Sequence, residues 1–424
     1  MKRNRKTQSG FVLIITLWVI VVLSTSAMAL LRQVQLEGKM VGFQRDTVIV
    51  DSIAKAGVRK ALILLREDMI KDAGEEFQDT RLFEFGEEDN YRYDGGNELW
   101  ADNPEEYIDV PFYEQNDKVG YYYVSVEDEC SKFPINNPET NVDQIAHLLE
   151  LTGVDEEEAR TLAGAIIDWR DPDDSVTDVG GRTFGRDGSD EFTFYNSGRE
   201  TRKGSVPPVV IKNAPIDSID ELLLIPGMTP AIVFGTVEPE EGGRQQRFQN
   251  RRLRKGEYLG LRHYVSVYNQ KVNFNTVKRE VLESLMFTLQ GDQAEKLAQD
   301  WVDYRNGRDG IPGTGDDNVL KTPDNSDLDD MHYTEVNGLT DQIMQSVWQF
   351  ATIDTMTFVV ESLAEYQGIK KGYRVVVQRN YIPWDQVPRY GFDTDKLEDL
   401  EQVRLQIRLF EPLFDAKDRI RQVS

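Results

Sequence analysis

The feature that most constrains this chain is an uninterrupted apolar run near the N-terminus, from Phe11 to Leu31, with no charged side chain inside it. At a rise of about 1.5 Å per residue, a helix of this length crosses the hydrocarbon layer of a bilayer, which is about 30 Å thick. Four cations lie between positions 2 and 6, and positive charge in front of such a helix keeps that end in the cytoplasm. The run therefore predicts a single-pass membrane helix, with everything after Arg32 outside the cytoplasm.

The residues around this run leave three kinds of N-terminal segment open. An ordinary signal anchor has an apolar helix of this length and is not cleaved. A cleaved secretory signal normally has a shorter apolar region of about 7–15 residues that ends at small residues. Such small residues are present near the end of the run, at Ser24, Ser26, Ala27 and Ala29. The third kind is indicated by the residues in front of the run, where Gly10 directly precedes Phe11.

A helical period continues beyond the membrane run, because eight further apolar residues lie close to one stripe of a helix. These residues are Val34, Met40, Val41, Val48, Ile53, Val58, Leu62 and Leu65. We therefore expect one long helix, with a transmembrane part at 11–31 and an amphipathic continuation at 32–70. Residues 71–117 are acidic and rich in turn-forming residues, which predicts surface loops.

Four segments alternate aromatic or β-branched residues with polar ones and are predicted to be strands. They are "KVGYYYVSVEDE", "TFVVESLAEYQG", "KGYRVVVQRN" and "VRLQIRLFEP", with a turn at Gly368 to Gly372 between the second and the third. We expect one antiparallel sheet that packs on the N-terminal helix. More than two hundred residues separate the first strand from the second. The sequence therefore predicts an α+β body split into 71–130 and 351–424, with a separate domain at 131–350 inserted into it.

The predicted insertion contains a weak internal repeat and is expected to be mainly α-helical. Each copy has an Asn-rich turn, a helix, a short break and a second helix, and the copies begin near Asn136 and Asn273. Between them, 216–232 reads as two helices around a turn at Pro226 and Gly227. This pattern resembles a helix-hairpin-helix, so we expect two SAM-like or helix-hairpin-like repeats that form a packing unit.

Composition excludes some functions and favours others. The net charge of −25 repels phosphate backbones, so no nucleic acid partner is expected. His147, His263 and His332 lie far apart and share no metal-ligand spacing. The sequence has no Gly-x-Ser-x-Gly, phosphate-loop or His-Glu-x-x-His motif. We therefore expect a protein that is not an enzyme and has no catalytic residues.

Two Asp-rich loops, one after each repeat, are the site-like features of the sequence. Calcium binds six to eight oxygens at about 2.3–2.6 Å, and Asp and Gly residues close together in a loop supply carboxylates and backbone carbonyls. Neither loop follows the EF-hand spacing, so ordinary solvated turns remain the alternative. The expected ligands are Asp309, Asp316 and Asp317, with the carbonyl of Ile311 or Thr314, in the second loop, and Asp171, Asp173 and Asp174 in the first.

The N-terminal residues resemble the leader of type IV prepilins, in which a short basic segment and a Gly precede a Phe that opens a long apolar helix. The resemblance implies that a membrane peptidase cuts after Gly10, so that 1–10 is the leader, and methylates Phe11. Most of these proteins have Glu as the fifth mature residue, whereas this chain has Ile15. In the family that Glu is taken to pair with the N-terminal amine of the preceding subunit. Its absence therefore fits a subunit with no predecessor, at the tip of a fibre.

A closer resemblance rests on the leader together with "VSVEDECSKFPINN", "AIIDWRDPDD", "DELLLIPGMTPAI" and "KVNFNTVKREVLESL" in this order. These segments are similar to the minor pseudopilin K family of the type II secretion system, up to about Asn380. The resemblance implies a pilin-like fold with an inserted helical domain that is associated with calcium. It implies a single-pass protein of the inner membrane, with its bulk in the periplasm, that helps to secrete proteins across the outer membrane.

The same resemblance implies a position and a set of partners. The protein would lie at the tip of the periplasmic pseudopilus and initiate its assembly. Its partners would be minor pseudopilins I and J, the major pseudopilin, the prepilin peptidase and the inner-membrane secretion platform. Two alternatives remain from the sequence: an adhesive tip pilin of a type IV pilus, and a membrane-anchored periplasmic enzyme with an unrecognised site.

Overall fold

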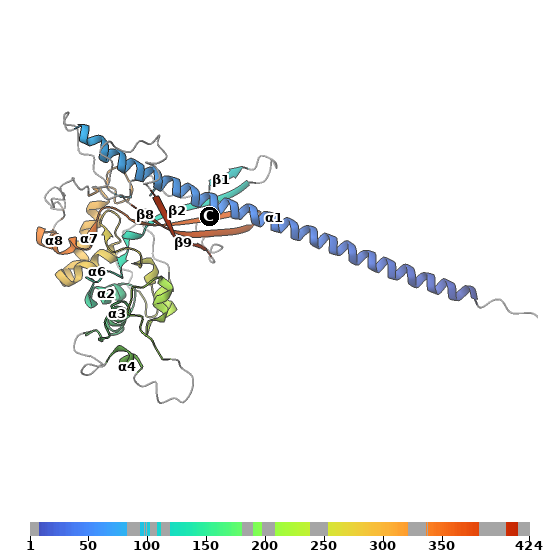
Figure 1. Cartoon of the computed structure of the whole chain (residues 1–424), viewed down its shortest axis with the longest axis horizontal. Coiled ribbons are helices and arrows are strands. Elements are labelled where there is room, and N and C mark those ends of the chain that lie inside the picture. Colours follow the sequence, from blue (N-terminus) through green and yellow to red (C-terminus); the bar gives the residue numbers. More distant parts are fainter. Residues whose placement is uncertain are drawn as a thin grey trace, which may run out of the picture.

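The computed structural model describes residues 8–82, 94–96, 98, 100–101, 108–111, 119–179, 190–196, 208–237, 253–320, 336, 338–380 and 404–413. A single long helix, α1, projects far beyond a sheet and a group of short helices that lie together at its C-terminal half (Figure 1). We call the five-stranded sheet with its part of α1 the sheet body, and the helices between residues 129 and 353 the helical body.

Helix α1 runs from Gln8 to Leu82, 75 residues. It extends past the expected end at residue 70, because residues 71–82 contain helix-forming side chains and no proline. The segment 71–82 is thus helix, where loop was predicted.

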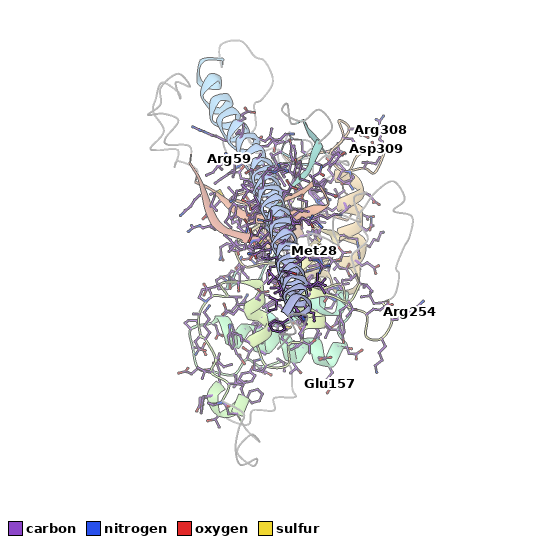
Figure 2. All side chains as sticks on the ribbon, turned by 90° about the vertical axis from the view of Figure 1, so that its right-hand side faces the viewer. Met28, Arg59, Glu157, Arg254, Arg308 and Asp309 are labelled. Carbon is purple, nitrogen blue, oxygen red and sulfur yellow. The ribbon has the colours of Figure 1, made fainter. Side chains whose placement is uncertain are left out.

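The predicted apolar stripe of α1 divides into two halves with different surroundings. Ile53, Val58 and Leu65 are buried against the sheet. Val34, Met40, Val41 and Val48 are exposed. The N-terminal part of α1 projects beyond the sheet (Figure 1) and toward the viewer in Figure 2. The stripe therefore serves the intramolecular core only from residue 50 onward, and its first half remains open for other contacts.

The sheet body contains one antiparallel sheet of five strands in the order β1-β2-β7-β8-β9. Its strands are β1 (Ile108–Pro111), β2 (Val119–Asp128), β7 (Thr357–Tyr366), β8 (Ile369–Asn380) and β9 (Arg404–Pro412). The four predicted strands are present. Strand β1 was not predicted, because it lies in the acidic stretch assigned to loops.

The turn between β7 and β8 is tighter than predicted. Its two residues, Gln367 and Gly368, both have positive φ angles, of 53° and 77°. Two such residues form the mirror-image turn whose twist matches an antiparallel hairpin. Gly372 consequently lies inside β8, opposite Leu363, and the predicted turn at Gly368 to Gly372 is wrong.

One face of the sheet packs on α1 and the other carries charged side chains. Val124, Val360 and Val375 are buried on the face toward α1. On the opposite face, Arg374 lies 3.9 Å from Glu361 and 3.7 Å from Glu411. The face away from α1 is therefore mixed, because Val359 and Val376 on it are buried while Arg374 and its acidic neighbours are partly exposed.

The helical body lies between β2 and β7 in the chain and has its own apolar core. Its longer helices are α2 (Val142–Leu151), α3 (Glu156–Arg170), α6 (Arg279–Gln290), α7 (Ala294–Arg305) and α8 (Asp341–Trp348). Its short elements are η1 (Glu129–Ser131), β3 (Phe133–Pro134), α4 (Glu191–Asn196), η2 (Ile219–Leu224), α5 (Pro230–Phe234), η3 (Leu261–His263), β4 (Val265–Ser266), β5 (Val272–Asn273), η4 (Gly291–Gln293) and β6 (Ala351–Thr352).

The internal repeat read from the sequence corresponds to two packed helix pairs, α2 with α3 and α6 with α7. The pairs meet where the Ser284 hydroxyl donates to the Gln144 carbonyl over 2.6 Å and the Gln144 amide donates to the Leu285 carbonyl over 3.0 Å. Between the pairs, the predicted turn is present at Gly227, with φ of 89°. Its flanking elements, η2 and α5, have only six and five residues, so they are shorter than the helices of a helix-hairpin-helix.

Helix α1 lies close to the sheet at Gly57, and this packing yields a stability prediction. A Cβ at this position would lie inside contact distance of the Ser362 hydroxyl and 3.2 Å from the Tyr122 ring. We expect Gly57→Ala to lower the free energy of unfolding by about 1–2 kcal/mol, because α1 must move off the sheet. Gly42→Ala is the control, since nothing lies within 4 Å there and alanine favours the helix by about 1 kcal/mol. Urea unfolding of both variants measures the difference; equal stabilities would contradict the close packing.

Candidate functional site

The N-terminal half of α1 is the most exposed apolar surface of the described chain. By its length and composition, this helix is long enough and apolar enough to cross a membrane. Side chains along it are strongly exposed, for example Leu13 at 72% and Trp18 at 64%. Phe11 and Ile15 lie on this bare helix, and Gly10 is inside its first turn. The residues expected for processing and assembly are therefore placed on a surface that only a membrane or other proteins can cover.

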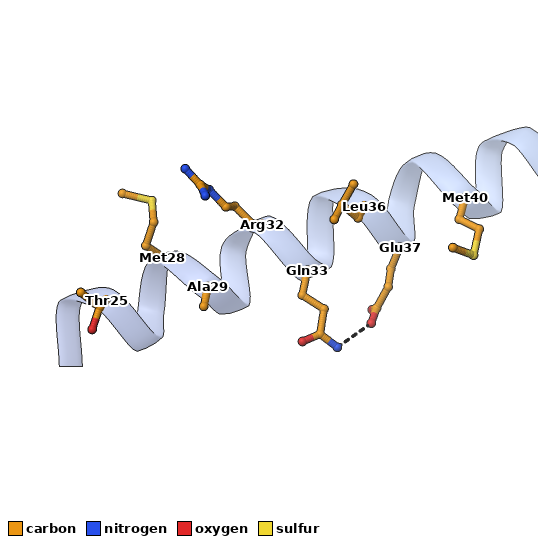
Figure 3. Close-up of a pocket in the computed structure, with 8 residues that line it drawn as sticks. All are labelled: Thr25, Met28, Ala29, Arg32, Gln33, Leu36, Glu37 and Met40. Atoms are coloured by element: carbon orange, nitrogen blue, oxygen red, sulfur yellow. Dashed lines mark hydrogen bonds between the residues drawn. The ribbon is translucent and has the colours of Figure 1, made fainter. Parts of the chain in front are cut away.

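A shallow concavity along this helix is formed by one helix face alone. Figure 3 shows it, with a 2.9 Å hydrogen bond from the Gln33 amide to the Glu37 carboxylate. A concavity lined by a single helix does not surround a small molecule, unlike the enclosed clefts of enzymes. Its lining residues are Thr25, Met28, Ala29, Arg32, Gln33, Leu36, Glu37 and Met40.

Two of the three histidines have packing roles. His147 stacks on Phe287, with ring centroids 3.9 Å apart, and its Nε2 lies 3.1 Å from Glu283. His263 Nε2 accepts a hydrogen bond from Arg262 over 3.0 Å, and burial lowers the pKa of His263 to about 3. His332 lies outside the described residues. The two described histidines lie in unrelated surroundings, as their sequence spacing predicted.

The first Asp-rich loop brings three carboxylates together at the end of α3. Asp171, Asp173 and Glu191 each place an oxygen within 4.8 Å of the others. Glu191 is only 2% exposed, and neither of its carboxylate oxygens has a hydrogen-bond partner among the described residues; the same holds for Oδ1 of Asp171. Burying carboxylate oxygens without hydrogen-bond donors costs free energy. These three carboxylates therefore have oxygens available to coordinate a cation.

Local contacts fold the first loop so that Glu191 reaches the aspartates. Asp168, buried in α3, accepts hydrogen bonds from the Thr177 amide over 2.7 Å and from the Tyr195 hydroxyl over 2.5 Å. The Glu191 amide donates to the Asp174 carbonyl over 3.1 Å, next to a bridge between Ser175 and Asp190. These contacts attach α4 to the end of α3.

Burial and mutual repulsion raise the pKa values of Glu191 and Asp171 in this group. Burial, and then the charges of Asp168 and Asp171, raise the pKa of Glu191 to about 8. Burial, and then the charge of Asp173, raise the pKa of Asp171 to about 6. A carboxylate whose pKa is raised is destabilised in its charged form, and a divalent cation between the oxygens would remove that cost.

Asp174 is expected from the sequence to be a ligand, but its carboxylate points elsewhere. Its Oδ1 accepts a hydrogen bond from the Asn213 side chain over 2.9 Å, and Asp174 is not among the three carboxylates that lie within 4.8 Å of one another. Glu191 was not found in the sequence, because it lies 18 residues after Asp173 and reaches it only through the folding of the loop. The structure thus brings together two of the three residues predicted for this loop, Asp171 and Asp173, and adds Glu191, which was not predicted.

The second Asp-rich loop is held by its own backbone. Asp316 accepts from the amides of Arg308 and Asp309, over 2.8 and 3.2 Å, and from the Thr314 hydroxyl over 2.7 Å. Asp317 Oδ2 accepts from the Gly313 amide over 2.6 Å. Asp309 accepts from the Ile311 amide over 2.8 Å.

These contacts compete with a cation for the same oxygens. The Ile311 carbonyl accepts from the Thr314 hydroxyl over 3.2 Å, and among the described residues Oδ1 of Asp317 has no partner. The second loop gathers no group of three carboxylates like that of the first, within the residues described.

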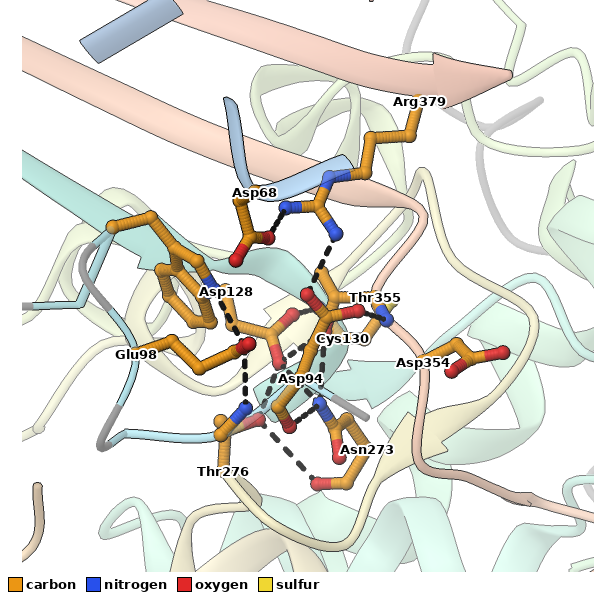
Figure 4. A network of polar contacts seen from close by, with 12 residues as sticks. Asp68, Asp94, Glu98, Asp128, Cys130, Asn273, Thr276, Asp354, Thr355 and Arg379 are labelled. Atoms are coloured by element: carbon orange, nitrogen blue, oxygen red, sulfur yellow. Dashed lines mark hydrogen bonds and ion pairs between the residues drawn. The ribbon is translucent and has the colours of Figure 1, made fainter. Parts of the chain in front are cut away.

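A third acidic group lies at the joint between the two bodies and already holds a cation. Arg379 of β8 pairs with Asp94 over 2.6 Å and with Asp68 of α1, beside Glu98. Its guanidinium also lies over the ring of Phe358, 4.4 Å from the centroid. Figure 4 shows Asp68 and Asp94 paired with the arginine, together with Glu98.

The same joint continues into the helical body through Asn273. Its side-chain amide donates to the Asp94 carbonyl over 2.9 Å, to Asp128 over 3.1 Å and to the Thr355 hydroxyl over 2.9 Å. Asp128 also accepts from Thr355 over 2.6 Å. Burial raises the pKa of Asp128 to about 7, and its hydrogen bonds oppose the shift. We call Asp68, Asp94, Asp128, Asn273, Thr355 and Arg379 the joint network.

Comparisons with known proteins agree with this architecture. Residues 127–234 match the family described as type II secretion system (T2SS), protein K. The search of curated proteins found no match. The chain is similar to a chain in the crystal structure of the GspK-GspI-GspJ complex from the enterotoxigenic Escherichia coli type 2 secretion system. The identity is 15%, the match covers 87% of this chain and 98% of that chain, and the TM-score is 0.51.

At this identity the structural likeness establishes the fold, and it confirms the predicted α+β class with a long N-terminal helix on an antiparallel sheet. The family match begins in β2 and extends through α5, so it includes the first helix pair and the first Asp-rich loop. Over residues 127–234 the chain is thus similar to the type II secretion system protein K family, and over most of its length it has the fold of a chain in the GspK-GspI-GspJ complex.

Proposed function

We propose that this protein is the minor pseudopilin at the tip of the periplasmic pseudopilus of a type II secretion system. It is anchored in the inner membrane by residues 11–31 and starts pseudopilus assembly together with minor pseudopilins I and J. The major pseudopilin then adds beneath this complex. The observation that carries the proposal is a bare apolar half-helix attached to a sheet body that carries a large helical body.

Each part of the molecule has a role in this proposal. The helix remains in the bilayer until apolar packing against partner helices extracts it. The helical body lies beside the C-terminal half of α1, at the end away from the membrane segment (Figure 1), where it would prevent another subunit from stacking above. Ile15 offers no carboxylate to the N-terminal amine of a preceding subunit. A subunit at the tip has no preceding subunit, so it does not need that carboxylate.

We also propose that the first Asp-rich loop binds a structural calcium ion through Asp171, Asp173 and Glu191. The donor set consists of carboxylate oxygens, which are the ligands that calcium prefers. Bound calcium would neutralise the mutual repulsion of the three acids and fix α4 on the end of α3. The second loop, with Asp309, Asp316 and Asp317, remains a weaker proposal, because its oxygens already accept backbone hydrogen bonds.

Sequencing the mature N-terminus in a host that has the secretion system and its prepilin peptidase tests the proposed function. We expect cleavage between Gly10 and Phe11, and co-purification of the processed chain with minor pseudopilins I and J from detergent. A Gly10→Val variant should keep its leader and fail to join them, whereas Gly38→Val, on the exposed helix, should be processed normally. Cleavage after the apolar run would indicate ordinary secretion, and recovery with type IV pilus subunits would indicate the adhesive alternative.

A further inference from the structure

The joint network lies between two bodies whose apolar cores are separate clusters, and it contains more acid than base. Four carboxyl groups gather there around the guanidinium of Arg379 (Figure 4). If all four were ionised, they would carry three more charges than this arginine balances. Charge that is buried without a partner is unfavourable, so the joint favours states in which a proton is bound. The four acids are Asp68, Asp94, Glu98 and Asp128.

Asp128 differs from the other two fully buried acids of the joint in its partners. Asp68 and Asp94 pair with Arg379. The donors to Asp128 among the described residues are neutral: the Cys130 backbone amide over 2.6 Å, the Thr355 hydroxyl over 2.6 Å, the Asn273 side-chain amide over 3.1 Å and the Thr276 hydroxyl. Asp128 is therefore the buried acid of the joint that best accommodates a proton.

The hydrogen bonds around Asp128 can accept that proton without moving a heavy atom. A proton on its Oδ2 would donate to the hydroxyl oxygen of Thr276. The Thr276 hydroxyl would then turn to the Asn273 carbonyl, which lies 3.5 Å away. A hydroxyl both donates and accepts, so Thr276 serves the neutral and the ionised state. Burial raises the pKa of Asp128 to about 7, its hydrogen bonds with the threonines oppose this shift, and the charge of Asp94 adds to it.

The other charged groups beside Asp128 do not balance its charge. They form two ion pairs of 2.8 Å each, Lys132 with Glu129 and Lys278 with Glu127. Burial raises the pKa of the Cys130 thiol, so this group stays neutral. Asp354, which precedes Thr355 in the chain, points away from Asp128 in Figure 4.

We propose that Asp128 is a proton-dependent switch that fixes the helical body on the sheet body when it is neutral and releases it when it is ionised. An ionised Asp128 next to Asp94 is solvated only if water enters the joint, and water enters only if the helical body moves away from the sheet at this end. The inference goes beyond the proposed function, because it concerns this chain whatever its place in a fibre.

The direction of the pH effect follows from where the proton is held. In the unfolded chain an aspartate has a pKa of about 4. Between about pH 4 and pH 7 the folded joint therefore keeps a proton that the unfolded chain has released. The contribution of Asp128 to stability is lost as pH rises through this window, so the joint is tighter in acid.

Distances between two spin labels test the movement. The labels are attached to exposed positions of the two bodies, through Glu158→Cys and Gln406→Cys, while Cys130 is buried. The full chain is studied in detergent with saturating calcium, so that the first Asp-rich loop does not titrate. We expect one narrow distance distribution at pH 5 and one about twofold wider at pH 9, as several orientations become populated. Asp128→Asn, which stays neutral, should keep the narrow distribution at both pH values, whereas Asp155→Asn, at an exposed acid, should behave as wild type.

Infrared difference spectra of the same chain measure the proton itself. A buried neutral carboxyl has a C=O stretch that a carboxylate lacks, and we expect one such band to disappear with a midpoint near pH 7. Asp128→Asn should remove this band, and Asp155→Asn should leave it. Thr276→Val removes a donor to the ionised form, so it should raise the midpoint by about 1 pH unit.

Equal widths at pH 5 and pH 9 in the wild type, or a full set of carboxyl bands in Asp128→Asn, would overturn the switch. So would a wide distribution of Asp128→Asn at both pH values. If Asp128→Asn does not fold, the wild-type widths and the midpoint of Thr276→Val decide, and an unchanged midpoint rejects the proposal. Cleavage before Phe11 and co-purification with pseudopilins test the proposed function separately.

Discussion

Arg379→Met is expected to lower the free energy of unfolding by about 3–5 kcal/mol, because it leaves the carboxylates of Asp68 and Asp94 buried without their cation. Arg379 is fully buried, and it joins α1, β8 and the segment at Asp94. Methionine fills much of the same volume, so the loss reports the charges more than a cavity. Urea unfolding of the full chain in detergent, followed by tryptophan fluorescence, measures it.

The chain supplies a matched control for this substitution on the same strand. Arg374 of β8 also lies near two acids, Glu361 and Glu411, but on the other face of the sheet, partly exposed to solvent and at 3.7 Å or more. Exposed ion pairs of this kind contribute about 0–1 kcal/mol, so Arg374→Met should change stability by less than 1 kcal/mol. Equal losses in the two variants would show that the joint network does not hold the two bodies together.

Calcium is expected to stabilise the protein by about 2.7 kcal/mol at a concentration one hundred times its dissociation constant. The reason is that a cation bound by Asp171, Asp173 and Glu191 in the folded state has no such site in the unfolded chain. Chelation with EDTA should therefore lower the thermal midpoint, as measured by circular dichroism. Glu191→Gln should abolish the response to calcium, whereas Glu158→Gln, an exposed acid of α3, should leave it unchanged.

The pH dependence of the same experiment has a defined sign. Glu191 and Asp171 have folded-state pKa values of about 8 and about 6, against about 4 in the unfolded chain. Between pH 4 and pH 8 the folded state holds protons that the unfolded chain has released, so stability without calcium should fall as pH rises through this window. Calcium should remove most of that fall. A calcium effect of the same size at pH 5 and pH 8, or a response that survives Glu191→Gln, would contradict the site.

Much of the fold could be predicted from local sequence patterns. The long helix with its candidate membrane segment and four of the five strands in the main sheet follow from patterns that are visible within ten to twenty residues. Strand β1 was missed because four residues ending in Pro111, inside an acidic stretch, give no alternation to detect. The end of α1 was misplaced because acidic residues favour loops and helices alike, and here the helix continued.

The candidate site was only partly predictable, for a different physical reason. Asp171 and Asp173 are adjacent in sequence to the end of a helix, so composition indicated them. Glu191 joins them only after α4 has folded back on α3. The joint network is more distant still: Arg379 pairs with residues 285 and 311 positions away in the chain. No local pattern indicates that these charges meet inside the protein.

The path of the chain between the two bodies has a mechanical consequence. The helical body leaves the sheet at Asp128 and returns at Thr357, and these positions lie on neighbouring strands, where Asp128 faces Phe358. A force that pulls the helical body away reaches the sheet through the covalent chain at two strand ends placed side by side, and such a force tends to separate the paired strands one residue pair at a time. The hydrogen bonds from Thr355 and Asn273 to Asp128 stabilise the first residue pair at these strand ends. If the protein occupies the proposed tip position, these hydrogen bonds hold the sheet at the point where force on the helical body would start to open it.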